Sequence, residues 1–175
     1  LNGGRESPFT GEDRILVPSP KVATYDQVPE MSTPALTELI LSKLRTKSYD
    51  FIVANVACPD MVGHTGNLEA TIAAAQAVDK LFEAVSGEVL SLYGALVITA
   101  DHGNAEAKYG PHGEIQTGHT TNPVPIIFIS RELQTSLQKK LQSGLLADVA
   151  PTVLSLMGLK APGTMTGRNL LQELQ

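Results

Sequence analysis

Residues 50–64 read DFIVANVACPDMVGH, and this stretch decides the fold class. Its first part, residues 50–57, is a short apolar run with β-branched side chains between turn residues, which is typical of a buried parallel strand. A second run of this kind spans residues 95–100. The polar residues that follow the two runs are Asp60, His64, Asp101 and His102. Polar side chains at the ends of two strands predict an open α/β sheet with a ligand crevice at that edge.

Two segments whose apolar residues have helical spacing lie before and between these predicted strands. Apolar side chains recur every three or four residues over residues 67–92, which predicts a long helix. A shorter helix is expected from Thr33, a candidate N-cap followed by Pro34 at the first helical position. Further along, residues 124–129 resemble a third strand, and residues 132–141 and 146–157 are expected to be helical. This alternation predicts an α/β fold with a mostly parallel sheet flanked by helices, joined by right-handed crossovers.

The 175 residues are expected to form one domain, in which residues 1–34 are an ordered loop rich in Pro and Gly and residues 35–171 are an α/β core. The net charge of −5 argues against nucleic-acid partners and anionic membranes. No stretch approaches the roughly 18 apolar residues of a membrane span. The single cysteine, Cys58, excludes an internal disulfide and fits a reducing compartment, so a cytoplasmic protein is expected.

Three of the four histidines lie close to the predicted strand ends. Carboxylate and neutral imidazole together suit zinc, manganese or iron. A spacing of four residues places Asp60 and His64 on one face if a helix follows the strand. For this pair alone, an N-capping Asp and a partly buried His bonded to the main chain are the favoured explanation. Adjacent Asp101 and His102 are costly to bury without a partner, and a divalent ion would compensate both.

His119 precedes the third predicted strand and is a further candidate ligand, whereas His112 resembles a surface-loop residue. Five candidate ligands exceed the three or four that one ion takes from protein, so two neighbouring ions are expected. Two-metal sites specialise in displacement at phosphorus. Residues 101–124, which carry three of these candidates, form an unusually long loop for a compact domain, and such loops are usually functional.

Six tracts resemble cofactor-independent (2,3-bisphosphoglycerate-independent) phosphoglycerate mutase, over residues 1–171. They are NGGRE (2–6), PSPKVATYD (18–26), PEMS (29–32), PDMVGHTG (59–66), TADHGNAE (99–106) and HTTNPVP (119–125). The resemblance implies an alkaline phosphatase-like metalloenzyme that interconverts 3- and 2-phosphoglycerate in glycolysis and gluconeogenesis. It also implies a phosphoserine intermediate and two divalent ions, manganese first, with zinc, magnesium, cobalt or iron as alternatives, and no organic cofactor.

Carried over by residue, the resemblance makes Asp60, His64 and His119 ligands of one ion and Asp101 and His102 ligands of the second. Residues 148–152 and 165–168 resemble the closing segment of the family, with a structural role.

The chain also departs from the family. The nucleophilic serine, one metal-binding aspartate, the catalytic lysine tract and the inserted transferase domain have no counterpart here, and Lys21 belongs to a different tract. We therefore expect the C-terminal part of the phosphatase domain, incomplete at its N-terminal strands and inactive alone, which could self-associate through an exposed sheet edge. Phosphoglycerate would be the substrate of the intact enzyme. The alternatives are a phosphopentomutase or phosphatase of the same metalloenzyme group, or a non-catalytic metal-binding fragment.

Overall fold

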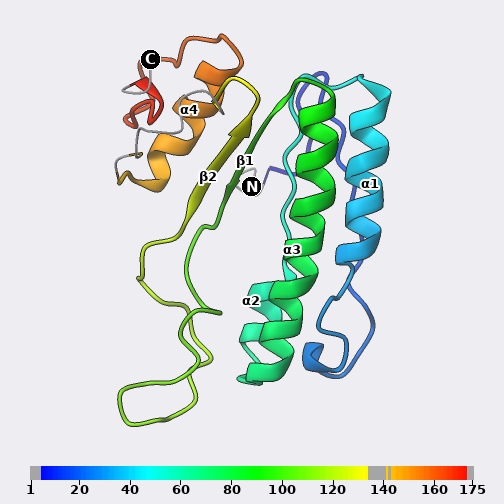
Figure 1. The fold of residues 1–175 in the computed structure, drawn as a ribbon, viewed down its shortest axis with the longest axis vertical. Helices are drawn as coiled ribbons and strands as arrows, with labels where there is room; N and C mark the ends of the chain where they lie inside the picture. The colour runs from blue at the N-terminus through cyan, green and yellow to red at the C-terminus, as the bar shows by residue number, and fades with distance from the viewer. Residues whose placement is uncertain (1–4, 134–140, 142, 173–175) are drawn as a thin grey trace. The chain divides into compact units, whose positions relative to one another are not determined.

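The computed structural model describes residues 5–133, 141 and 143–172 (Figure 1). Its contacts divide the chain into two compact units. Unit 1 comprises Leu1–Glu88 and Gly103–Thr121, and unit 2 comprises Val89–His102 and Asn122–Gln175. Most of the helix expected over residues 132–141 lies outside the described residues.

Unit 1 is helical. A 3-10 helix at Tyr25–Gln27 precedes the α-helices α1 (Thr33–Thr46), α2 (Cys58–Gly63) and α3 (Leu68–Ser91), the last of which runs on into unit 2. The predictions of helices from residue 33 and over residues 67–92 are thus confirmed. In α1 the cap position is Ser32 rather than Thr33, and a proline stands in the first turn, where its missing N–H is not needed.

The core of unit 1 lies where α2 packs against α3. Its buried members are Met31, Cys58, Val62, Ala70, Ala74 and Val78. Leu68 and Ile72 on α3 remain 39% and 49% exposed, because the small side chains of Ala70 and Ala74 pack in this core instead. Cys58 is buried in this core, as a structural residue should be.

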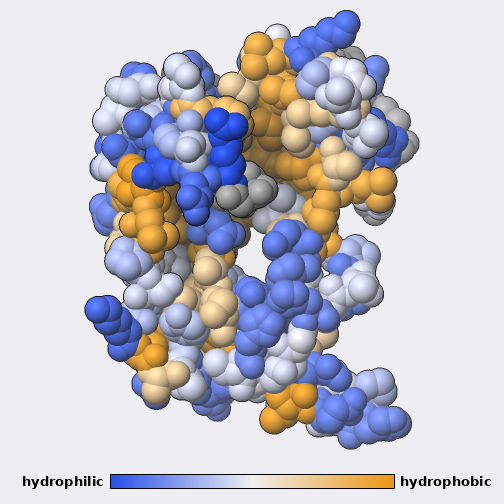
Figure 2. Space-filling model, turned by 180° about the vertical axis from the view of Figure 1, so that it is seen from behind, coloured by the Kyte–Doolittle hydropathy of each residue, from blue (hydrophilic) through white to orange (hydrophobic). Residues whose placement is uncertain are grey.

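The expected strand over residues 50–57 is wrong for this structure. These residues form neither helix nor strand, and Phe51 and Val53 are 54% and 57% exposed. A strand needs a neighbour to satisfy its backbone groups, and no strand in the described part of the chain pairs with this segment. Exposed apolar side chains are visible over several parts of the surface (Figure 2).

Unit 2 contains the sheet. Strands β1 (Ala95–Thr99) and β2 (Ile126–Ser130) lie side by side (Figure 1), close to the two strands expected over residues 95–100 and 124–129. They pair antiparallel, with Val97 opposite Phe128. A parallel arrangement of these two strands is therefore wrong. The loop expected over residues 101–124 is confirmed: among the described residues this segment holds no helix and folds back on itself through antiparallel bridges at Gly103 and Thr120 and at Tyr109 and Ile115.

The two-stranded sheet and the helices are consistent with the α/β class, and the mostly parallel sheet stays a prediction. The predicted helix over residues 146–157 is confirmed as a 3-10 turn, Leu146–Asp148, followed by α4 (Val149–Leu156). In the described ranges no helix has the length and apolar character needed to cross a membrane.

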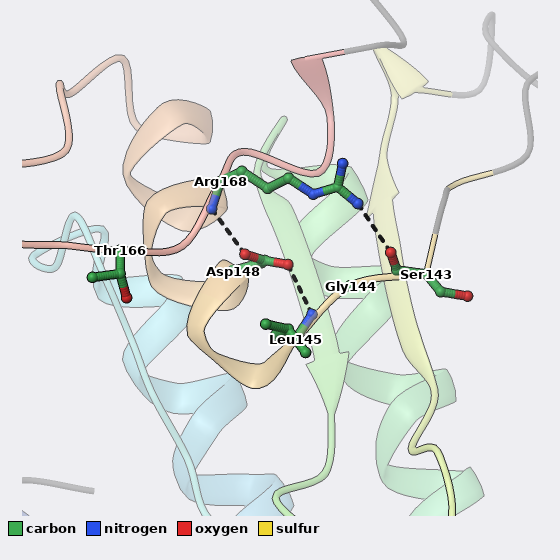
Figure 3. Close-up of a pocket in the computed structure, with 6 residues that line it drawn as sticks. All are labelled: Ser143, Gly144, Leu145, Asp148, Thr166 and Arg168. Carbon is green, nitrogen blue, oxygen red and sulfur yellow. Dashed lines mark hydrogen bonds between the residues drawn. The ribbon is translucent and has the colours of Figure 1, made fainter.

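Asp148 directly precedes α4 and is hydrogen-bonded to the segment around Arg168 (Figure 3). Its carboxylate accepts hydrogen bonds from the backbone N–H groups of Leu145 and Arg168, each at 2.8 Å, and these donors lower the pKa of Asp148. Thr152 Oγ1 donates to Asp148 O and accepts from Leu170 N. Arg168 also donates to Ser143 O at 3.0 Å. These contacts are consistent with the structural role expected for residues 148–152 and 165–168.

Candidate metal centre

Helix α2 carries two of the predicted ligands. Asp60 lies in its first turn and His64 caps its C-terminal end, where His64 N donates to Asp60 O at 3.0 Å. The residues after the apolar run therefore turn into a helix, and one face presents both side chains, as the four-residue spacing predicts. His64 Nε2 is 3.3 Å from Asp60 Oδ1.

His119 joins this pair from the loop between β1 and β2. Its Nε2 is 3.1 Å from His64 Nε2 and 3.3 Å from Asp60 Oδ1. One ligand atom from each of these residues lies within 4.8 Å of the others. Two imidazole nitrogens and a carboxylate oxygen that converge in this way form a donor set that zinc and manganese take from proteins. The residues therefore fit a divalent ion.

The backbone fixes the tautomer of His64. Its Nδ1 lies 2.6 Å from Thr117 O. A carbonyl oxygen can only accept, so Nδ1 carries the hydrogen, and in the neutral ring Nε2 keeps its lone pair. A second hydrogen bond of this kind typically orients histidine ligands of metals. In the neutral ring, Nε2 is therefore the nitrogen that can bind an ion, and it faces Asp60 and His119.

A buried polar chain stands behind Asp60. Asn104 Nδ2 donates to Asp60 Oδ1 at 2.9 Å, and Lys108 Nζ donates to Asn104 Oδ1 at 2.6 Å and to Gly63 O at 2.8 Å. Asn104 and Lys108 are each only 4% exposed, and burial lowers the pKa of the Lys108 ammonium. Sequence reasoning assigned neither residue a role, since only the fold shows that this lysine is buried.

The loop that carries His119 is tied at its base. Thr120 N donates to Gly103 O at 2.8 Å. The Glu106 carboxylate accepts from Asn104 N at 2.7 Å and from Thr120 Oγ1. These bonds join the residue after His119 to Asn104, which contacts Asp60, and so give the third predicted ligand a defined place.

Asp101 and His102 follow β1 in unit 2. Their side chains approach each other, with His102 Nε2 3.6 Å from Asp101 Oδ2, and the Asp101 side chain is 87% exposed. The cluster formed by the described residues comprises only the other three predicted ligands, so a second metal site at Asp101 and His102 stays a prediction. His112 is exposed on its loop, as expected, and its N–H donates to Glu114.

Comparison with known proteins supports the class of protein that this site suggests. The profile of the Metalloenzyme superfamily matches residues 1–161, and the chain belongs to this superfamily.

Within it, the chain is similar throughout to 2,3-bisphosphoglycerate-independent phosphoglycerate mutase, of which it corresponds to a C-terminal part. It is 53% identical to the enzyme of Syntrophotalea carbinolica over 98% of the chain and 33% of that relative. It is 49% identical to the enzyme of Clostridioides difficile over 99% of the chain and 34% of that relative.

A solved structure of Leishmania mexicana phosphoglycerate mutase, determined at low cobalt concentration, superposes with a TM-score of 0.84 at 30% identity. The superposition covers 96% of this chain and 33% of the chain in that structure. The chain thus spans about a third of the length of the relatives it matches.

Proposed function

We propose that this chain supplies metal ligands to an enzyme that interconverts 3-phosphoglycerate and 2-phosphoglycerate through a phosphoserine intermediate. One observation carries the proposal: Asp60, His64 and His119 converge on one point. They do so in a chain that is about half identical to phosphoglycerate mutases along its whole length. The serine and the groups that hold the substrate would lie in the part of those relatives that this chain does not match.

In this proposal Asp60, His64 and His119 hold one divalent ion, and Asp101 and His102 contribute to a second. Manganese is the ion proposed, although zinc, magnesium, cobalt or iron would satisfy the same donors. When bound, such ions supply a Lewis acid for phosphoryl oxygens. Asp60 provides the negative charge at the first site. In the neutral form of His64, Nε2 is the nitrogen with the free lone pair, because the hydrogen is on Nδ1 and is donated to Thr117 O.

The reaction assigns the enzyme to glycolysis and gluconeogenesis, with phosphoglycerate as its small-molecule substrate. Its place in the cell would be the cytoplasm, where the single buried cysteine would stay reduced. No organic cofactor is needed for this chemistry.

The test is an assay of a full-length enzyme that carries these 175 residues. Conversion of 3-phosphoglycerate to 2-phosphoglycerate should vanish on chelation and return with Mn²⁺. Asp60→Asn and His64→Ala should each lower kcat/KM by about 100-fold or more, because a metal supplies several kcal/mol of transition-state stabilisation. His112→Ala is the matched control and should leave the rate unchanged.

Three outcomes would overturn the proposal. They are turnover of pentose phosphates in place of phosphoglycerate, release of inorganic phosphate as the main product, and no metal-dependent turnover at all. The 175-residue chain by itself is expected to show no mutase activity, since covalent catalysis and substrate positioning each supply much of the rate.

A further inference from the structure

We propose that Lys108 is a positioning residue for Asp60 and acts through the side-chain amide of Asn104. This inference rests on the proposed metal site, because Asp60 matters here as a ligand. It adds a residue outside the ligand set, on the loop between β1 and β2.

The ammonium of Lys108 decides which way the Asn104 amide points. An ammonium can only donate, and an amide has one accepting and one donating end. With Lys108 Nζ 2.6 Å from Asn104 Oδ1, the oxygen must face the lysine. The NH₂ group is then the end that faces Asp60 Oδ1, at 2.9 Å. The reversed amide would set donor against donor and acceptor against carboxylate, so the lysine excludes it.

The burial of Asn104 and Lys108 reinforces this orientation of the amide. Asn104 and Lys108 are each 4% exposed, so water cannot readily replace either hydrogen bond. A buried ammonium is costly unless it is paired, and Lys108 gains a second partner in Gly63 O, at 2.8 Å. Gly63 ends the same helix that carries Asp60.

Gly63 also provides space for the relay, which is the chain of hydrogen bonds from Lys108 through Asn104 to Asp60. A Cβ atom at this position would lie 2.3 Å from Asn104 Oδ1 and 3.2 Å from Lys108 Nζ. The amide and the ammonium therefore pack directly against the backbone of α2, where any side chain would displace them.

The relay ends on the oxygen that faces both histidines. Asp60 Oδ1 accepts from Asn104 and lies 3.3 Å from the Nε2 atoms of His64 and His119. Hydrogen bonds to a ligating carboxylate hold its orientation and tune its affinity for metal. The positive charge of Lys108 acts in the opposite sense, because it repels a bound cation. A useful test must separate these two effects.

A double-mutant cycle makes that separation. Mn²⁺ binding is measured by titration calorimetry on the 175-residue chain, as wild type, Lys108→Met, Asn104→Ala and the double variant. Lys108→Met removes the repulsion in both backgrounds, whereas it can disturb amide orientation only where Asn104 is present. We expect Lys108→Met to weaken binding about 10-fold more with Asn104 than with Ala at that position. Equal fold-changes in both backgrounds would overturn the relay. Lys80→Met, an exposed change on α3, is the matched control.

Hydrogen exchange of the Asn104 side-chain amide gives a second readout that needs no metal. These protons should exchange slowly in the wild type and at least about 10-fold faster in Lys108→Met, because the amide loses its anchor. Unchanged exchange would overturn the positioning role of Lys108, whether or not the chain binds Mn²⁺. Failure of the wild type to bind Mn²⁺ would instead count against the proposed function.

If Lys108→Met does not fold, Lys108→Arg decides the question. Arginine keeps a charged donor and should retain Mn²⁺ affinity within about threefold. A loss as large as that of Asn104→Ala would count against positioning by a donor.

Discussion

At the residue scale, hydrogen bonds to the main chain and to a buried side chain orient two groups of the candidate metal centre. Thr117 O sets the tautomer of His64, and Asn104 holds one oxygen of Asp60. Hydrogen bonds behind the ligands are typical of functional metal sites.

Gly63 offers a direct probe of this local packing. We expect Gly63→Ala to lower the free energy of unfolding by about 1–3 kcal/mol, because its Cβ would clash with the buried Asn104 amide. Gly87→Ala is the matched control. It lies within α3 with nothing within 4 Å of an added Cβ, and it should raise stability by about 0.5–1 kcal/mol. Urea unfolding followed by circular dichroism measures both, and equal effects would contradict this packing.

Asp148 predicts a dependence of stability on pH. Its pKa is lowered in the folded state by the backbone donors of Leu145 and Arg168. A lowered folded pKa stabilises the fold above the ordinary carboxyl pKa of 3.8, and the gain is lost as the pH falls through the folded pKa. Asp148→Asn has one acceptor oxygen for two N–H donors, so it should be less stable than the wild type at neutral pH.

The measurement for Asp148→Asn is the urea midpoint from neutral to acid pH. The difference between wild type and variant should shrink below the ordinary carboxyl pKa. A constant difference across that range would show that the ionised carboxylate is not what stabilises the segment.

The sequence predicted the cluster of Asp60, His64 and His119 better than its surroundings. These three residues could be singled out because candidate metal ligands come from a few residue types in recognisable tracts. Lys108 could not, since its role depends on burial against Gly63, which lies far from it in the chain.

At the scale of elements, the accuracy of prediction followed the range of the interactions. Helices α1 and α3 were predicted because a 3.6-residue period is local. The strand expected over residues 50–57 is absent, because a strand forms only with a partner, and sequence alone does not show that partner. The relative direction of two strands likewise depends on the return path of the chain. Between β1 and β2 that path is a folded-back loop, so the pair is antiparallel.

The start of α3 gives a prediction at this scale. Asn67 Oδ1 accepts from Ala70 N at 3.1 Å, which satisfies a backbone donor in the first turn. Asn67→Ala should lower the free energy of unfolding by about 1 kcal/mol, whereas Asn67→Ser keeps an acceptor oxygen and should cost less. Thermal unfolding of the two variants tests this. An alanine variant as stable as the serine variant would mean that the cap contributes nothing.

At the scale of the whole molecule, the chain is about a third as long as the phosphoglycerate mutases that it matches. Its sheet has two strands in the described residues, and each has one edge without a strand partner there. Unpaired edges favour association between chains.

We therefore expect the 175-residue chain to form dimers or larger species in sedimentation velocity, increasingly so at higher concentration. Ile127→Lys, at a 45% exposed position on β2, should reduce association because a charge on the sheet opposes pairing. Leu16→Lys, at an 88% exposed position outside the sheet, should not. A clean monomer at high concentration would contradict this prediction.

The central claim is that Asp60, His64 and His119 hold one divalent ion, and titration calorimetry with Mn²⁺ tests it most directly. The account predicts about one tightly bound ion per chain, with weaker binding at acid pH because a protonated imidazole cannot ligate. His64→Ala should weaken this binding by about 100-fold or more, because removing a ligand weakens metal binding more than removing a residue that only orients a ligand. His102→Ala should leave the binding largely intact. The reverse order of losses, or no tight binding by the wild type, would contradict the account.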